Sequence, residues 1–239
     1  MPKNREIWQG MSLPTRIDKT ARILRKRYGD FAHHNRKNPF EELLFILCSV
    51  QTQESNYRGT FAALRRAFPR FEGLTSATAR SIAKPLKSGG LSPTKSKAIR
   101  KICGCIQARF GKPTLAPLQT MNSEECETFL TSLPGVGTKV ARCVMMYSLG
   151  RKIFPVDTHC WRICRRLGWV RSTSRDGVCS KQDMDRLQEM IPAELRYSLH
   201  VNLISLGREF CRSGNPRCPE CPLASVCKTS SRRGRKPDV

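Results

Sequence analysis

The chain has 239 residues, with 43 Lys and Arg against 19 Asp and Glu and a formal net charge of +24. This length suits one large domain or two modest ones, and the basic excess favours a polyanionic partner, with nucleic acid ahead of a membrane. Since no long apolar run or secretory leader is present, we expect an intracellular protein, in the cytoplasm or nucleoid or in a nucleus, with no membrane partner.

Twelve cysteines raise the question of a disulfide framework. In an intracellular chain we expect thiols that are reduced or bound to metal. Eight of them are scattered through helical patterns and are interpreted as small, buried, inert side chains. These are Cys48, Cys103, Cys105, Cys126, Cys143, Cys160, Cys164 and Cys179.

The first half of the chain shows helical spacing of apolar residues and no strand alternation. Asn38 followed by Pro39 is a helix-start signature, with Asn as the cap and Pro in the first turn. The predicted helices cover about 15–28, 41–50, 56–68 and 76–88. A loop over 91–97 then opens a basic helix that runs to about 110, and 111–119 is a linker.

A polar stretch follows the nearly all-apolar helix 41–50. Uncharged polar groups at a buried helix end are costly unless they are paired or a ligand pairs with them. The segment 49–53 is therefore either a helix cap with a surface loop or part of a binding face.

The segment Leu133-Pro134-Gly135-Val136 is a predicted type II turn, because Pro presets the first central φ and Gly accepts a positive second one. Asn122 or Ser123 caps the helix before the turn, and a helix over 138–149 follows it. The sequence therefore predicts a helix, a glycine hairpin and a helix.

Such a hairpin presents backbone N–H groups without intrahelical acceptors at the positive end of a helix dipole. Glycine at Gly135 and Gly137 lets a phosphate approach these groups closely. The pattern therefore predicts a DNA-binding anion site that is blind to base sequence, although a plain helix–helix turn fits the hairpin alone.

Further helices are predicted over 158–167, over 181–190 and from Pro192 to near Cys211. The basic tail 228–239 is expected to be disordered. Four cysteines, Cys211, Cys218, Cys221 and Cys227, precede this tail in one proline-punctuated loop. Four close thiols indicate metal, and structural zinc or an iron–sulfur cluster satisfies the same ligand count.

Two motifs, Leu-Pro-Gly-Val-Gly-Thr-Lys ending at Lys139 and Phe-Pro-Val-Asp-Thr-His ending at His159, resemble the helix-hairpin-helix (HhH-GPD) DNA glycosylase superfamily. The intact lysine resembles its endonuclease III branch, and the likeness runs from about Phe40 to Cys227. The resemblance implies an all-α, two-lobed fold. One lobe is a six-helix barrel with the hairpin, over 32–151; the other is an iron–sulfur cluster lobe, from 1–31 and 152–239, whose four-cysteine loop holds a [4Fe-4S] cluster.

The resemblance also implies roles for single residues. Lys139 falls on the catalytic lysine and Asp157 on the catalytic aspartate, which can serve equally as the N-cap of the next helix. Gln51 corresponds to the residue that fills the gap left by an extruded nucleotide, and Leu91 to a wedge in the duplex. His159 matches a DNA-contacting position, or is a solvated surface histidine.

A lysine nucleophile suits base excision because an extruded base exposes its glycosidic bond. The amine displaces the base and forms an imine with the opened sugar, which permits β-elimination of the strand. Asp157 as a carboxylate assists lysine deprotonation and balances positive charge on the sugar. His200, within the last long helix, is interpreted as packing.

The implied function is base-excision repair by a monomeric bifunctional DNA glycosylase and abasic-site lyase. Its expected partner is double-stranded DNA with a damaged or mismatched base, and damaged pyrimidines are the default substrate. Alternatives are uracil or thymine mismatches, and methylated cytosine, since residues 154–158 together with 166–170 also resemble plant demethylase-like glycosylases. The adenine-mismatch branch lacks the lysine found at Lys139. A non-catalytic DNA-binding module would need the hairpin but not Lys139 and Asp157 together.

Overall fold

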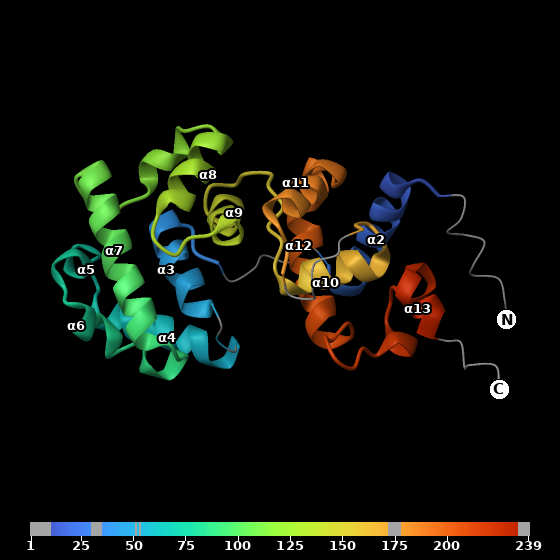
Figure 1. The fold of residues 1–239 in the computed structure, drawn as a ribbon, viewed down its shortest axis with the longest axis horizontal. Coiled ribbons are helices and arrows are strands. Elements are labelled where there is room, and N and C mark those ends of the chain that lie inside the picture. The colour runs from blue at the N-terminus through green and yellow to red at the C-terminus, as the bar shows by residue number, and fades with distance from the viewer. Residues whose placement is uncertain (1–10, 30–34, 51, 53, 172–177, 234–239) are drawn as a thin grey trace. The chain divides into compact units, whose positions relative to one another are not determined.

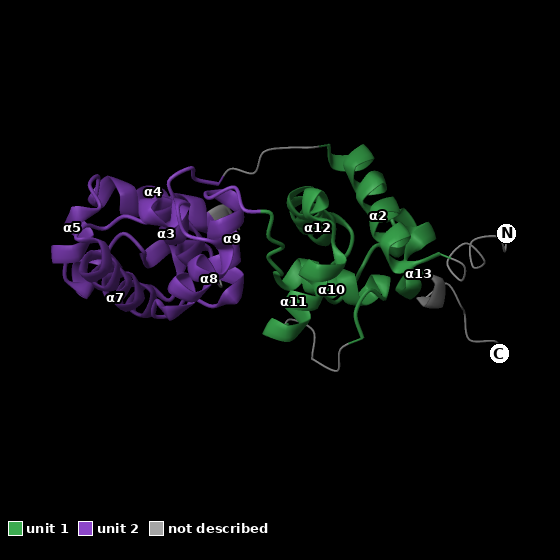
Figure 2. Ribbon diagram, turned by 90° about the horizontal axis from the view of Figure 1, so that it is seen from above, with its two compact units in different colours: residues 1–33, 152–239 green, residues 34–151 purple. Residues whose placement is uncertain are grey.

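The computed structural model describes residues 11–29, 35–50, 52, 54–171 and 178–233, and every regular element within these ranges is a helix (Figure 1). The chain divides into two compact units (Figure 2). Residues 34–151 form the hairpin unit, and residues 1–33 with 152–239 form the terminal unit. Within the described ranges, no helix has the length and apolar character needed to cross a membrane.

The hairpin unit is built around α3, Pro39–Ser49, which packs against α4, α7 and α9 (Figure 1). All its apolar residues from Phe40 to Cys48 are buried, so the nearly all-apolar sequence is explained by neighbours on several sides. The other elements are α4 Glu54–Ala67, α5 Glu72–Ser76, α6 Ala79–Ala83, η1 Lys87–Gly89, α7 Ser92–Phe110, η2 Ala116–Gln119, α8 Ser123–Ser132 and α9 Thr138–Tyr147.

The predicted start of α3 is confirmed. The Asn38 side chain accepts hydrogen bonds from the N–H groups of Phe40 and Glu41, each at 3.0 Å. Pro39 occupies the first turn, where its missing N–H costs nothing.

The single helix predicted over 76–88 is wrong, because this segment contains the end of α5, α6 and η1. Thr78 is extended and its hydroxyl accepts a hydrogen bond from Ser81 N–H at 3.1 Å, so a new helix begins there. Pro85 has no N–H to continue the hydrogen bonds of the helix, and α6 ends at Ala83, although Lys84 keeps right-handed helical dihedrals.

The terminal unit has a core of its own around Trp161, Phe154 and Leu203, each fully buried. Helix α10 packs against α12, and α12 packs against α2. The elements are α2 Leu13–Tyr28, α10 Thr158–Leu167, α11 Lys181–Met190, η3 Ala193–Leu195, α12 Arg196–Glu209, η4 Cys218–Glu220, η5 Ala224–Val226 and α13 Lys228–Arg233.

The expected disorder from Lys228 onward is wrong for residues 228–233, which form α13. This helix packs against α10, and Thr229 Oγ1 donates to Arg166 O at 2.9 Å. Tertiary contact therefore overrides a composition typical of a flexible tail. Residues 234–239 lie outside the described part of the chain.

Candidate functional site

The hairpin between α8 and α9 has the predicted turn geometry. Gly135 has φ +78°, and Val136 N–H donates to Leu133 O at 3.0 Å, as a type II turn requires. Leu133 and Val136 are buried, whereas Gly135 and Gly137 are exposed. The apolar residues therefore fix the hairpin to the unit while its glycines face outward.

Gly137 is the N-cap of α9 and offers no side chain to the amides of the first turn. A Cβ placed there would meet nothing within 4 Å, so space is open around this helix end. Lys139 is the second residue of α9 and is partly exposed. The predicted phosphate-binding amides and the predicted nucleophile thus share one helical turn.

A buried ion pair joins the two helices of the hairpin. Arg142 of α9 donates from Nε and a terminal nitrogen to the two carboxylate oxygens of Glu127 on α8, at 2.9 and 3.2 Å. Only 3% of the Arg142 side chain is exposed. This bidentate contact fixes the angle between the helices, and the sequence interpretation missed it.

Asp157 is the N-cap of α10 in the terminal unit. Its Oδ1 accepts a hydrogen bond from Cys160 N–H at 2.7 Å, which confirms the predicted capping role. The neighbouring Val156 is buried, while Asp157 is only half-buried. The carboxylate is therefore held at a fixed helix end and remains accessible to solvent.

His159 lies on the first turn of α10, where α10 crosses α12. A Cβ added at Gly207 of α12 would lie 2.4 Å from His159 Nδ1, so only glycine permits this approach. Arg162 lies 3.0 Å from the same nitrogen, and burial lowers the pKa of the imidazole. His159 is thus partly packed inside the unit, and its DNA contact stays a prediction.

His200 is fully buried on α12, as the packing interpretation requires. Its Nδ1 lies 2.9 Å from Pro155 O and 3.6 Å from Cys160 Sγ. These contacts tie α12 to the segment that leads into Asp157.

Leu91 precedes α7 and is 50% exposed. Its φ of +51° is left-handed, which is rare for a residue with a side chain. The structure therefore presents this leucine on the surface of the hairpin unit, and its wedge role stays a prediction. Gln51 lies outside the described residues.

The four cysteines of the predicted cluster loop lie around η4 and η5, and each is partly buried. Burial, together with the charges of the other three cysteines, raises the pKa of the Cys221 thiol to about 11. Arg166 donates to Cys211 Sγ at 3.2 Å. In the described ranges, no three His, Cys, Asp or Glu side chains are drawn together as ligands of one metal ion.

Of the eight scattered cysteines, six are buried as predicted. Cys105 on α7 is exposed and Cys179 is partly exposed, so the buried interpretation is wrong for these two. Cys105 lies on the outward face of an amphipathic helix, where its neighbours Arg109 and Lys101 are also exposed.

Comparison with known proteins identifies the family. The profile described as HhH-GPD superfamily base excision DNA repair protein matches residues 45–189. The chain is 31% identical to endonuclease III of Bacillus subtilis over 83% of its own length and 85% of that protein's. The chain belongs to this superfamily, as an endonuclease III-like member.

Two further likenesses agree with this placement. A putative DNA glycosylase of Arabidopsis thaliana is 36% identical over 70% of the chain, which spans 55% of that relative's length. A trapped covalent intermediate of endonuclease III with DNA superposes with a TM-score of 0.78, at 26% identity, over 94% of this chain and all of that one. The all-helical glycosylase fold expected from the sequence is thereby confirmed.

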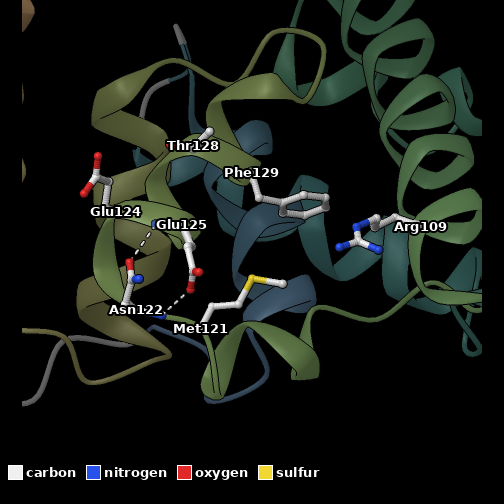
Figure 3. A pocket seen from close by; sticks show the side chains of 7 residues that line it. All are labelled: Arg109, Met121, Asn122, Glu124, Glu125, Thr128 and Phe129. Atoms are coloured by element: carbon white, nitrogen blue, oxygen red, sulfur yellow. Dashed lines mark hydrogen bonds between the residues drawn. The ribbon is translucent and has the colours of Figure 1, made fainter.

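A pocket of about 540 Å³ opens elsewhere in the hairpin unit (Figure 3). The Asn122 side chain and Glu125 beside it form a capping box, with hydrogen bonds of 2.9 and 2.8 Å. The lining residues are Arg109, Met121, Asn122, Glu124, Glu125, Thr128 and Phe129. None of the glycosylase motif residues lines it, so this hollow is not where the predicted chemistry takes place.

Proposed function

We propose that the chain is a base-excision-repair DNA glycosylase with abasic-site lyase activity. The observation that carries this proposal is Lys139 on the first turn of α9, beside the exposed, glycine-capped end of that helix. A phosphate-binding hairpin alone serves any DNA-binding protein. A lysine in the same helical turn adds a nucleophile at a fixed distance from the bound backbone.

The proposed reaction begins with attack of the neutral Lys139 amine on C1′ of an extruded nucleotide. The C–N bond to the base breaks, and the base leaves with the bonding electron pair. The attached nitrogen then loses a proton, and the C1′–O4′ bond breaks as O4′ takes up a proton, which opens the sugar and leaves an imine between Nζ and C1′. This imine acidifies the proton on C2′, whose loss eliminates the 3′ phosphate. The products are a cleaved strand and, after hydrolysis of the imine, the free lysine.

Lys139 must lose a proton before it attacks. Lys139 lies at the positive end of the α9 dipole. The partial positive charge there repels an ammonium and so favours the neutral amine. Asp157 supplies a carboxylate that accepts a proton and balances oxocarbenium-like charge on the sugar. Its hydrogen bond to Cys160 N–H keeps the carboxylate oriented for this work.

DNA binding follows from the hairpin and from the +24 charge. Gly135 and Gly137 bring backbone amides to one phosphate, and Lys and Arg side chains contact others. We assign Gln51 to the gap left by the extruded nucleotide, Leu91 to a wedge in the duplex beside that nucleotide, and His159 to a DNA contact. The protein acts as a monomer on intracellular double-stranded DNA.

We further infer that Cys211, Cys218, Cys221 and Cys227 hold a [4Fe-4S] cluster. The fit is chemical: four thiols whose charges act on one another form an all-sulfur donor set, and Arg166 donates to one of them. Such a cluster would crosslink the loop after α12 and orient its basic side chains toward phosphate. Purified protein is expected to be brown and to contain about four iron atoms per chain. Colourless protein with stoichiometric zinc would overturn this assignment.

The proposed substrates are damaged pyrimidines, and a panel of labelled duplexes tests this. The panel carries an oxidised pyrimidine, uracil or thymine opposite guanine, methylated cytosine, or a plain abasic site. Each duplex is incubated with borohydride, which reduces an imine to a stable protein–DNA adduct. Adducts with the oxidised pyrimidine and abasic duplexes are expected. Base release without any adduct indicates a monofunctional enzyme, and no reaction on any duplex supports a binding module.

A further inference from the structure

Lys95 is a buried lysine in a chain whose other basic residues mostly face solvent. It lies on the first turn of α7 and is 8% exposed. Its ammonium donates to Cys48 O at 2.9 Å, to Thr52 Oγ1 at 2.6 Å and to Gly89 O at 3.2 Å. All three ammonium hydrogens therefore have acceptors, and burial lowers the pKa of the amine.

The three acceptors belong to two segments far apart in sequence. Cys48 and Thr52 lie at the end of α3 and just beyond it, and Gly89 lies at the end of η1. Thr52 Oγ1 also donates to Gly89 O at 2.7 Å, so hydroxyl and ammonium together join the two segments. Cys48 O is one of the last carbonyls of α3, which lack intrahelical donors, and the ammonium supplies one.

The segment held in this way carries Leu91. Gly89 is pressed against Thr60, because a Cβ at Gly89 would lie 2.8 Å from Thr60 Oγ1. Leu91 O then accepts the first α7 hydrogen bond from Lys95 N–H at 2.9 Å. Lys95 is therefore hydrogen-bonded to the Leu91 segment twice. Its side chain bonds Gly89, two residues before Leu91, and its backbone N–H bonds the carbonyl of Leu91 itself.

The conformation of Leu91 needs such support. Leu91 is left-handed and half-exposed, which is unfavourable both for its backbone and for its apolar side chain. A residue keeps such a strained conformation only when contacts with the surrounding structure hold it there. The hydrogen-bonded frame of Lys95, Thr52, Gly89 and Cys48 provides these contacts.

We propose that Lys95 is a positioning residue that holds Leu91 as a rigid protrusion for insertion into the duplex beside the extruded nucleotide. This inference rests on the proposed function. It assigns to the lysine no contact with the reacting atoms. A rigid leucine loses little freedom on insertion, so more of the contact energy remains to support extrusion of the base.

The test compares Lys95→Met with Lys97→Met, which removes an exposed charge from the same helix. Two reactions are measured for each variant: single-turnover excision from a duplex with an oxidised pyrimidine, and borohydride trapping on a single-stranded abasic oligonucleotide. The second needs no extrusion. Lys95→Met is expected to slow duplex excision at least about tenfold and to change single-strand trapping less than about twofold. Lys97→Met is expected to change duplex excision and single-strand trapping by the same factor, so it should show no selective loss on the duplex.

A double-mutant cycle that combines Lys95→Met with Leu91→Ala measures the coupling between the two residues in duplex excision. A lysine with only a structural role would show no such coupling. If Lys95 acts through Leu91, adding Lys95→Met to Leu91→Ala slows duplex excision by less than about twofold more. Independent, multiplicative losses overturn the proposal, and so does an equal loss by Lys95→Met on both substrates.

If Lys95→Met fails to fold in a thermal unfolding assay, Thr52→Val decides. It removes one hydroxyl from the frame with little change of shape. Duplex excision is again expected to slow more than single-strand trapping, by a smaller factor than in Lys95→Met. An equal effect on both substrates counts against the proposal. Wild-type protein that neither excises nor traps rejects the proposed function instead, so the two failures are distinguishable.

Discussion

The N-termini of α9 and α10 use the same physics in opposite ways. The N-cap of α9 is Gly137, which has no capping side chain, and the first turn of this helix has no acidic residue. The N-cap of α10 is Asp157, whose carboxylate accepts a hydrogen bond from the Cys160 N–H at 2.7 Å. Both ends carry the partial positive charge of a helix dipole. One is open to an anion from outside, and the other already holds its own.

This difference supports the different roles proposed for the two motifs. In the proposed function, the open end binds a phosphate that arrives with the DNA, and Lys139 follows within the same turn. At the filled end, the hydrogen bond from the first-turn amide fixes the Asp157 carboxylate in place and offsets part of its negative charge. The capping role of Asp157 therefore supports its proposed catalytic role, because the cap supplies the orientation that the chemistry needs.

Asp157→Asn separates capping from catalysis and should have the largest effect. Asn caps helices about as well as Asp, so the free energy of unfolding should change by less than about 1 kcal/mol. Loss of the carboxylate should lower single-turnover base excision by about 10²- to 10⁴-fold. Thermal unfolding and excision rates on the preferred duplex measure both. Unchanged excision would reduce Asp157 to a helix cap.

Glu127→Ala tests what holds the open end of α9 in place. The change leaves the Arg142 guanidinium, which is 3% exposed, without its bidentate carboxylate. A buried ion pair broken on one side costs about 3–5 kcal/mol, so chemical denaturation should show a loss of that order. Glu124→Ala, at an exposed position on the same helix, is the control and should stay within about 0.5 kcal/mol. Equal effects would mean that the pair does not support the hairpin.

Glu42 on α3 predicts a pH dependence of stability. Burial raises the pKa of its carboxyl from 4.5 to about 7, opposed by hydrogen bonds from Arg36 N–H and Asn35 and by the charges of Arg36 and Lys139. The folded state therefore binds the proton more tightly than the unfolded state. Its contribution is fully present below pH 4.5 and is lost as pH rises to about 7.

Glu42→Gln cannot titrate, so its advantage over the wild type should grow by about 3 kcal/mol from roughly pH 4 to pH 8. Denaturant unfolding across this range measures the difference. Glu41→Gln, beside it on α3 and partly exposed near Arg65, is the control and should show a much smaller trend. A difference between Glu42→Gln and wild type that is constant with pH would contradict the raised pKa.

Gly137→Asp converts the open end of α9 into a filled one, and its effect should be the smallest. Gly137 has φ −89° and open space around its Cβ position, so Asp fits without strain. The new carboxylate occupies the amides and repels phosphate, so DNA affinity should fall about tenfold at about 0.1 M salt. Gly137→Asn caps without charge and should lose less. Equal affinity of wild type and Gly137→Asp would mean that no phosphate binds at this helix end.

Features encoded by neighbouring residues were predictable from the sequence. The Asn38 cap, the Gly135 turn and the Asp157 cap each depend on residues within about four positions, where local geometry decides the conformation. The helices 158–167 and 181–190 were predicted with the bounds that α10 and α11 have.

Features that depend on distant residues were not predictable. Glu127 and Arg142 meet across the hairpin, and Lys95 meets Cys48 over 47 positions, so no local pattern marks either contact. The helix α13 exists where Thr229 meets Arg166, against its local composition. The break at Thr78 was visible as a capping residue but was overlooked within an apparently periodic segment.

The most direct test of the central claim is to locate the borohydride adduct. Wild-type protein is trapped on an abasic duplex and digested, and the DNA-linked peptide is sequenced by mass spectrometry. The expected adduct lies on Lys139, in the first turn of α9, and it disappears in Lys139→Ala. An adduct on another lysine, or one that persists in Lys139→Ala, would contradict the assignment of the nucleophile to the open end of this helix.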